Sequence, residues 1–180
     1  MGSDNYSAAP LDIDEIAEYH QDVLASLRVF FSSSSEEFTE KYVGYSVQEV
    51  RNILRTREYE TDLRSTLILL AAMEGLFRVD YEDRSRRRLR DPLSRALREL
   101  HKEYGSKARL DEDILEKWKL HGPELPGRTL IGELRGALNF RNWLAHGRYY
   151  TPKLGRKYDY PDVFRLADAV VNQLLAQPEA

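Results

Sequence analysis

The stretch "ILRTREYETDLRSTLILLAAMEGLF", residues 53–77, carries apolar side chains at helical spacing over roughly seven turns. Ser46 and Glu49 form a capping-box pattern ahead of it, and few helix breakers interrupt the sequence from there to about Tyr81. The stretch therefore predicts one long helix. No pair of strand-like segments with a hairpin turn is visible elsewhere, so the sequence predicts an all-α fold.

Apolar spacing and capping residues predict five more helices. They cover residues 12–31, 92–104, 111–120, 129–146 and 162–175. Asp91 and Pro92 are typical of a helix start, Gly105 is typical of a helix stop, and Asp111 is expected to cap the next helix. We predict an antiparallel bundle of about five or six helices in a single domain, residues 12–176, after a disordered lead-in, residues 1–11.

Composition excludes several kinds of site. The chain has 180 residues and no cysteine, which rules out disulfides and thiolate chemistry. Its four histidines lack metal-ligand spacing, so we expect neither a metal nor a cofactor. No apolar run approaches the roughly 20 residues of a membrane helix, and we expect a soluble, cytoplasmic protein. With a net charge of −3, the chain lacks the overall positive charge that is typical of nucleic-acid-binding domains.

Two charged residues interrupt apolar helix faces. In the helix 129–146, positions 130, 134, 137, 138, 141 and 145 form one stripe that is apolar except at Arg141. In the long helix, Glu74 lies on an apolar seam, one turn before Arg78. A buried charge is costly unless it is paired, so we predict an ion pair between Glu74 and Arg141.

A polar stripe accompanies Arg141. Asn142, His146 and Tyr149 follow it at helical spacing, at the end of the same predicted helix. These side chains either fasten the helices together or lie where a substrate meets them. The residues alone leave both interpretations open.

The segment "FRNWLAHGRYY", residues 140–150, resembles the signature of HEPN-domain ribonucleases, an arginine followed four to six residues later by histidine near the end of a late helix. The matching residues are Arg141, Asn142 and His146, and "EGLFR", with Glu74 and Arg78, resembles an accessory acidic and basic pattern of several HEPN groups. The resemblance implies a HEPN-like bundle that forms a homodimer through the 129–146 helix, with one composite active site.

The resemblance also implies metal-independent cleavage of RNA without a cofactor. The ribose 2′-OH would attack the adjacent phosphate and leave 2′,3′-cyclic phosphate and 5′-hydroxyl ends. His146 would transfer the proton, and Arg141 would hold the phosphate. Asn142 would orient these groups or the substrate, and Glu74 would fix Arg141 or join the proton transfer.

Members of this family include toxins of toxin–antitoxin pairs and phage-defence effectors, and we expect one of these roles. In toxins that an antitoxin modifies, the tyrosine stands two residues after the histidine, whereas Tyr149 and Tyr150 stand three and four residues after His146. An antitoxin or another regulatory partner therefore stays open. The alternative is a non-catalytic HEPN-like module that binds RNA, a nucleotide or a protein partner.

Further residues are candidates for RNA contact. The run "RSRRRLR", residues 84–90, is basic, and aromatic residues after His146 alternate with basic ones. The candidate substrate-binding residues are Arg78, Arg84, Arg86, Arg87, Arg88, Tyr149 and Tyr150, with Tyr158 and Tyr160 as further stacking candidates. A solvated loop balanced by Glu82, Asp83 and Asp91, and ordinary surface tyrosines, would explain the same residues.

Overall fold

The computed structural model describes residues 11–32, 35–124 and 126–175, and these residues form seven α-helices and no strand. The helices are α1 (Ile13–Ser32), α2 (Glu36–Lys41), α3 (Val47–Arg86), α4 (Pro92–Tyr104), α5 (Leu115–His121), α6 (Gly127–Ala145) and α7 (Tyr160–Val170). The predicted all-α bundle is confirmed. Within the described ranges, no helix has the length and apolar character needed to cross a bilayer.

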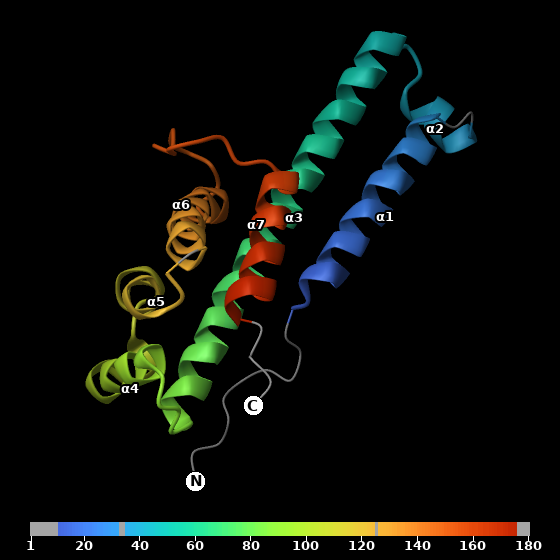
Figure 1. Ribbon diagram of the computed structural model, residues 1–180. Helices are drawn as coiled ribbons and strands as arrows, with labels where there is room; N and C mark the ends of the chain where they lie inside the picture. Colours follow the sequence, from blue (N-terminus) through green and yellow to red (C-terminus); the bar gives the residue numbers. More distant parts are fainter. Residues whose placement is uncertain (1–10, 33–34, 125, 176–180) are drawn as a thin grey trace.

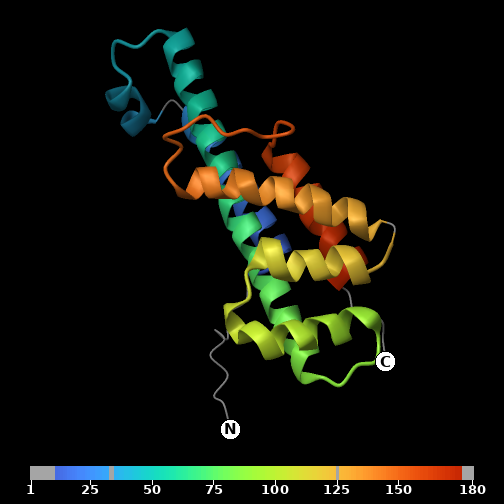
Figure 2. The same cartoon turned by 90° about the vertical axis from the view of Figure 1, so that its left-hand side faces the viewer.

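The long helix α3 organises the molecule (Figure 1). Antiparallel α1 lies along one side of it, and α4, α5, α6 and α7 pack around its second half. Figure 2 shows α4, α5 and α6 crossing α3 one above another, with α5 between the other two. The first half of α3 and most of α1 therefore extend from the body as a two-helix arm, with α2 at its tip.

The hydrophobic core lies around the second half of α3. Before Leu63 this helix has no buried residue, whereas Leu69, Leu70, Met73 and Phe77 are almost completely buried. Helices α4 to α7 contribute the other core residues, which include Leu97, Leu115, Ile131, Leu134, Val163 and Val170. The core thus fixes where α6 crosses α3.

Local sequence signals placed most helix ends correctly. The capping box of Ser46 and Glu49 is present, and α4 begins and ends where Asp91 and Gly105 predicted. The long helix continues five residues beyond Tyr81, to Arg86. The predicted lead-in lies outside the described residues, apart from Leu11.

The structure differs from the predicted helices in three places. The sequence reading missed α2, which Ser35 caps by accepting a hydrogen bond from the Phe38 amide at 3.2 Å. Asp111 caps no helix, because a wide π-type turn, Leu110–Ile114, precedes α5 and the Asp111 side chain binds Arg135 instead. The last helix begins at Tyr160 after the cap Asp159, and ends in a second π-type turn, Val171–Leu175.

A buried histidine joins α1, α3 and α7. The Nδ1 atom of His20 lies 3.0 Å from the Ser65 hydroxyl, and its Nε2 atom lies 3.4 Å from an Asp62 carboxylate oxygen. The ring stacks on Tyr160 with 3.7 Å between the centroids. Burial lowers the pKa of His20 below its ordinary value, and the Asp62 carboxylate opposes this effect.

His20 should make stability depend on pH. Because its pKa is lower in the folded state, the unfolded chain takes up the proton first, and stability falls as pH drops below about 6.5. We expect the difference in melting temperature between wild type and His20→Gln to shrink between about pH 7.5 and about pH 5. A difference that stays constant or grows over this range would show that His20 is not the titrating group.

Candidate functional site

The Glu74 carboxylate binds two arginines at the crossing of α3 and α6. One carboxylate oxygen lies 2.8 Å from Arg141 Nη2 of α6, which confirms the predicted ion pair. The other accepts hydrogen bonds from Arg78 Nε and Nη2, both at 3.1 Å. Arg78 Nη1 also donates to the Ala108 carbonyl at 3.4 Å. The cluster holds two positive charges and one negative charge.

Arg141 lies at the edge of the core, not on its buried seam. The predicted stripe is buried at its centre, but toward the end of α6 the buried side turns to Phe140, which stacks on Tyr158. The Arg141 side chain is 30% exposed and Glu74 is 22% exposed. The Arg141 side chain is therefore anchored by Glu74 and partly exposed.

The asparagine after Arg141 shares in holding it. Arg141 Nη1 donates to the Asn142 side-chain oxygen at 3.1 Å. The Arg141 Nε atom is buried and has no hydrogen-bond partner among the described residues. Among the roles considered for Asn142, this hydrogen bond supports the orientation of Arg141.

His146 terminates α6, and its side chain is exposed. Its backbone amide donates to the Asn142 carbonyl at 3.0 Å, so the residue continues the helical turn. Within the described part of the chain, its imidazole makes no hydrogen bond, ion pair or ring contact. An exposed imidazole without a partner can exchange protons with a bound molecule.

An ion pair with α3 holds the turn after His146. Gly147 and Arg148 both have positive φ, 76° and 60°, a region that favours glycine but costs a side-chain-bearing residue energy. Both terminal nitrogens of Arg148 bind the Glu60 carboxylate of α3, at 2.8 and 3.1 Å. Hydrogen bonds from Arg148 hold the pKa of Glu60 below its ordinary value.

His146 thus lies between two anchored arginines. Arg141 is tied to α3 at Glu74 and Arg148 at Glu60, positions roughly 21 Å apart along the helix at about 1.5 Å per residue. The sequence reading missed Glu60 and Arg148. Their only local signal is Gly147, which predicts a left-handed turn but no partner for the arginine.

The tyrosines divide into two groups. Tyr149 is 81% exposed and Tyr150 is 42% exposed, and their rings meet edge to face. Tyr158 and Tyr160 are only 8% and 7% exposed. Tyr158 packs against Phe140 and Tyr160 against His20, so the suggestion that these two stack on bases is wrong.

The arginine run lies apart from the Glu74 cluster, toward the end of α3. Arg84 is largely buried, binds Asp80 at 2.8 Å and donates to the Ser94 hydroxyl at 3.1 Å. This arginine holds α3 to α4 and its side chain is only 11% exposed, so we leave it out of the site.

The remaining arginines of the run are exposed. Arg86 and Arg87 pair with Glu82 and Asp83 at 4.0 and 2.9 Å. Arg88 lies exposed in the turn before α4. The acidic residues that flank the run therefore balance part of its charge, as the alternative interpretation expected.

The arrangement has the elements of an anion-binding site. The cluster of Glu74, Arg78 and Arg141 has a net positive charge, and both of its arginine side chains are partly exposed. The exposed imidazole of His146, which has no partner among the described residues, lies at the end of α6. Such groups can hold a phosphate and move a proton. No group of three or more His, Asp or Glu side chains in the described residues could hold a metal ion.

Comparisons of the chain with protein-family models, curated proteins and solved structures found no match.

Loss of the shared carboxylate should destabilise the bundle. Glu74→Ala leaves two half-buried guanidinium groups without their counter-charge, and we expect the free energy of unfolding to fall by about 2 kcal/mol. The control is Glu58→Ala on the same helix. This variant removes a more exposed ion pair, the one with Arg28, and should lower the free energy of unfolding by at most about 1 kcal/mol. Chemical denaturation measures both, and equal losses would show that Glu74 has no special role in stability.

The pair of Glu60 and Arg148 can be tested by charge exchange. Glu60→Arg and Arg148→Glu each place like charges together and should lower the melting temperature. The double variant restores an opposite pair and should recover most of the loss. Additive losses in the double variant would contradict a specific pair.

Proposed function

We propose that the chain is a metal-independent endoribonuclease of HEPN type. The observation that carries the proposal is the placement of His146. This exposed imidazole, without a partner among the described residues, lies at the end of α6, the helix that carries Arg141. Asn142 of α6 and Glu74 of α3 hold Arg141 in place. The resemblance of "RNWLAH" to the HEPN signature names these same residues, and their contacts are compatible with the roles that it implies.

The proposed reaction is transesterification within the RNA chain. The imidazole of His146 takes the proton of the ribose 2′-OH, whose oxygen then attacks the adjacent phosphorus. The P–O5′ bond breaks, and the departing oxygen receives a proton from an imidazolium. Arg141 binds the phosphate oxygens and offsets the charge that develops on them. No metal ion is needed, because side chains supply both the proton transfer and the positive charge.

A second copy of the chain would complete the site. Two proton transfers call for two groups, and each protomer offers one histidine at this position. The outward face of α6 supports this dimer, because Gly132, Asn139, Asn142 and His146 are exposed on it at helical spacing. Gly132, Asn139 and Asn142 carry no charge, so two such helices can approach each other at these positions. The proposed setting is a toxin or phage-defence effector that acts on cytoplasmic RNA.

Product analysis tests the proposal. Wild type should cleave single-stranded RNA in EDTA and leave 2′,3′-cyclic phosphate and 5′-hydroxyl ends, whereas a DNA of the same sequence should stay intact. His146→Ala should lower the rate by at least about 100-fold, with little change in melting temperature because the side chain is exposed. The matched control is His121→Ala, which removes another exposed histidine at a helix end.

Two outcomes would contradict the proposal. Equal cleavage by wild type and His146→Ala would place the activity elsewhere. Binding of RNA without cleavage by any variant would favour the non-catalytic module instead.

A further inference from the structure

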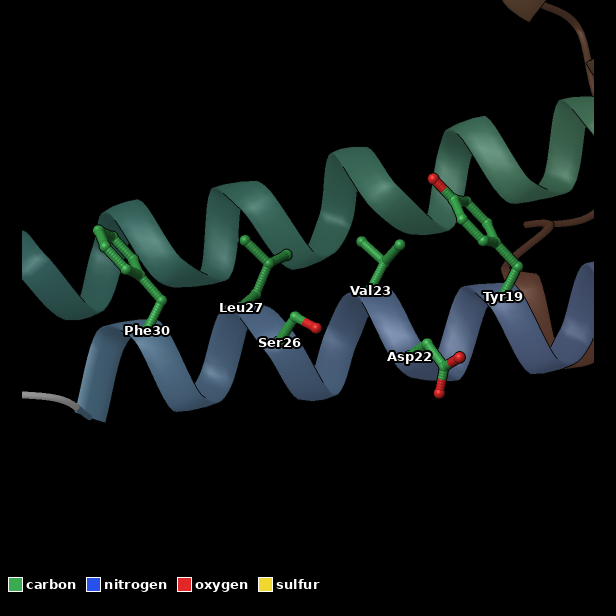
Figure 3. Close-up of a pocket in the computed structure, with 6 residues that line it drawn as sticks. All are labelled: Tyr19, Asp22, Val23, Ser26, Leu27 and Phe30. Carbon is green, nitrogen blue, oxygen red and sulfur yellow. The ribbon is translucent and has the colours of Figure 1, made fainter.

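A shallow groove runs along α1. Its outer part, about 390 Å³, is lined by Tyr19, Asp22, Val23, Ser26, Leu27 and Phe30 (Figure 3). Its inner part, about 210 Å³, has Leu11, Ile16 and Tyr19 on one side and Ser65 and Ile68 of α3 on the other. Because both parts share Tyr19, we treat them as one surface, the α1 groove.

The α1 groove leaves apolar side chains uncovered. Val23, Leu27 and Phe30 are only half-buried, although they follow the helical spacing of a core stripe. Tyr19 is 69% exposed and Ile68 is 42% exposed. A pair of helices cannot bury both of its apolar stripes alone and is normally covered by further helices. The two helices of the arm therefore leave uncovered the apolar face that further helices would cover in a four-helix bundle.

Charges of opposite sign border the two sides of the groove. Asp12, just before α1, and Glu15 and Asp22 of α1 line it. On α3, Arg64 stands four residues before Ile68 and is exposed, so it lies on the same side of the helix. Neither Glu15, Asp22 nor Arg64 makes an ion pair among the residues that the structure describes.

The register of the two helices places the opposite charges at one height. His20 contacts Ser65, and Asp22 and Arg64 lie within two residues of this contact. A two-fold axis along the groove would bring α1 of one copy against α3 of the other. Asp22 of each copy would then face Arg64 of the other, and both apolar strips would be covered.

We propose that a second copy of this chain occupies the α1 groove. An acidic edge, an apolar middle and a basic edge are self-complementary under a two-fold axis, as an isologous interface requires. A partner helix of one charge sign fits this groove less well. An acidic helix would be repelled by Asp12, Glu15 and Asp22, and a basic helix would be repelled by Arg64. The product is a four-helix bundle made of α1 and α3 from both copies.

This contact is independent of the proposed ribonuclease activity. Helix α1, which carries most of the groove, and α6, which carries Arg141, lie on opposite sides of α3 (Figure 1). A contact through α6 would therefore add to the contact through the groove.

Measurement of the assembly mass tests the inference. By sedimentation equilibrium at micromolar concentration, Tyr19→Glu should lower the mass of the wild-type assembly to that of the monomer, or to that of the dimer formed through α6 if this second contact is also present. The control Tyr104→Glu changes an exposed tyrosine at the end of α4 and should leave the mass unchanged. Asp22→Arg and Arg64→Asp should each lower the mass, and the double variant should restore it.

Other results would overturn the inference and leave the proposed function distinguishable. A monomeric wild type, or an unchanged mass in Tyr19→Glu, would exclude the groove contact. A mass halved only by Asn139→Arg, on the outward face of α6, would exclude the groove while supporting the dimer proposed for the ribonuclease.

Discussion

The ion pair between Glu74 and Arg141 is the interaction on which the candidate site depends. It joins α3 to α6 at the edge of the core, where both side chains keep some exposure. A fully buried arginine would be locked to its partner, and a fully exposed one would have no fixed position. The intermediate position orients the guanidinium and leaves it accessible, and it sets where the last turn of α6 places His146.

The rest of the site extends this constraint. Arg78 binds the same carboxylate, so Glu74 is itself held in place and the cluster keeps a net positive charge. Beyond the helix end, Glu60 holds Arg148 in a backbone conformation that its side chain disfavours. His146 thus lies between two anchored arginines in the sequence, and its imidazole makes no hydrogen bond, ion pair or ring contact with the residues that the structure describes. That combination suits a group that must exchange a proton with a substrate.

Local chemistry explains what could be predicted from the sequence. Caps such as Ser46 and Asp91 act within one turn, and an apolar seam interrupted by Glu74 or Arg141 can be recognised in the sequence. The pair of Glu60 and Arg148 could not, since 88 residues separate them. The burial of Tyr158, Tyr160 and Arg84 depends likewise on what packs over them, which periodicity does not reveal.

The most direct test of the central claim is a nuclear magnetic resonance titration with a short 2′-O-methyl RNA, which can bind but cannot be cleaved. The ring signals of the four histidines and the Nε signals of the arginines report on separate parts of the surface. We predict that His146 and Arg141 shift together, with one dissociation constant, while His20 and Arg84 stay unchanged. Shifts confined to the arginines near Arg88, with His146 unmoved, would contradict the account.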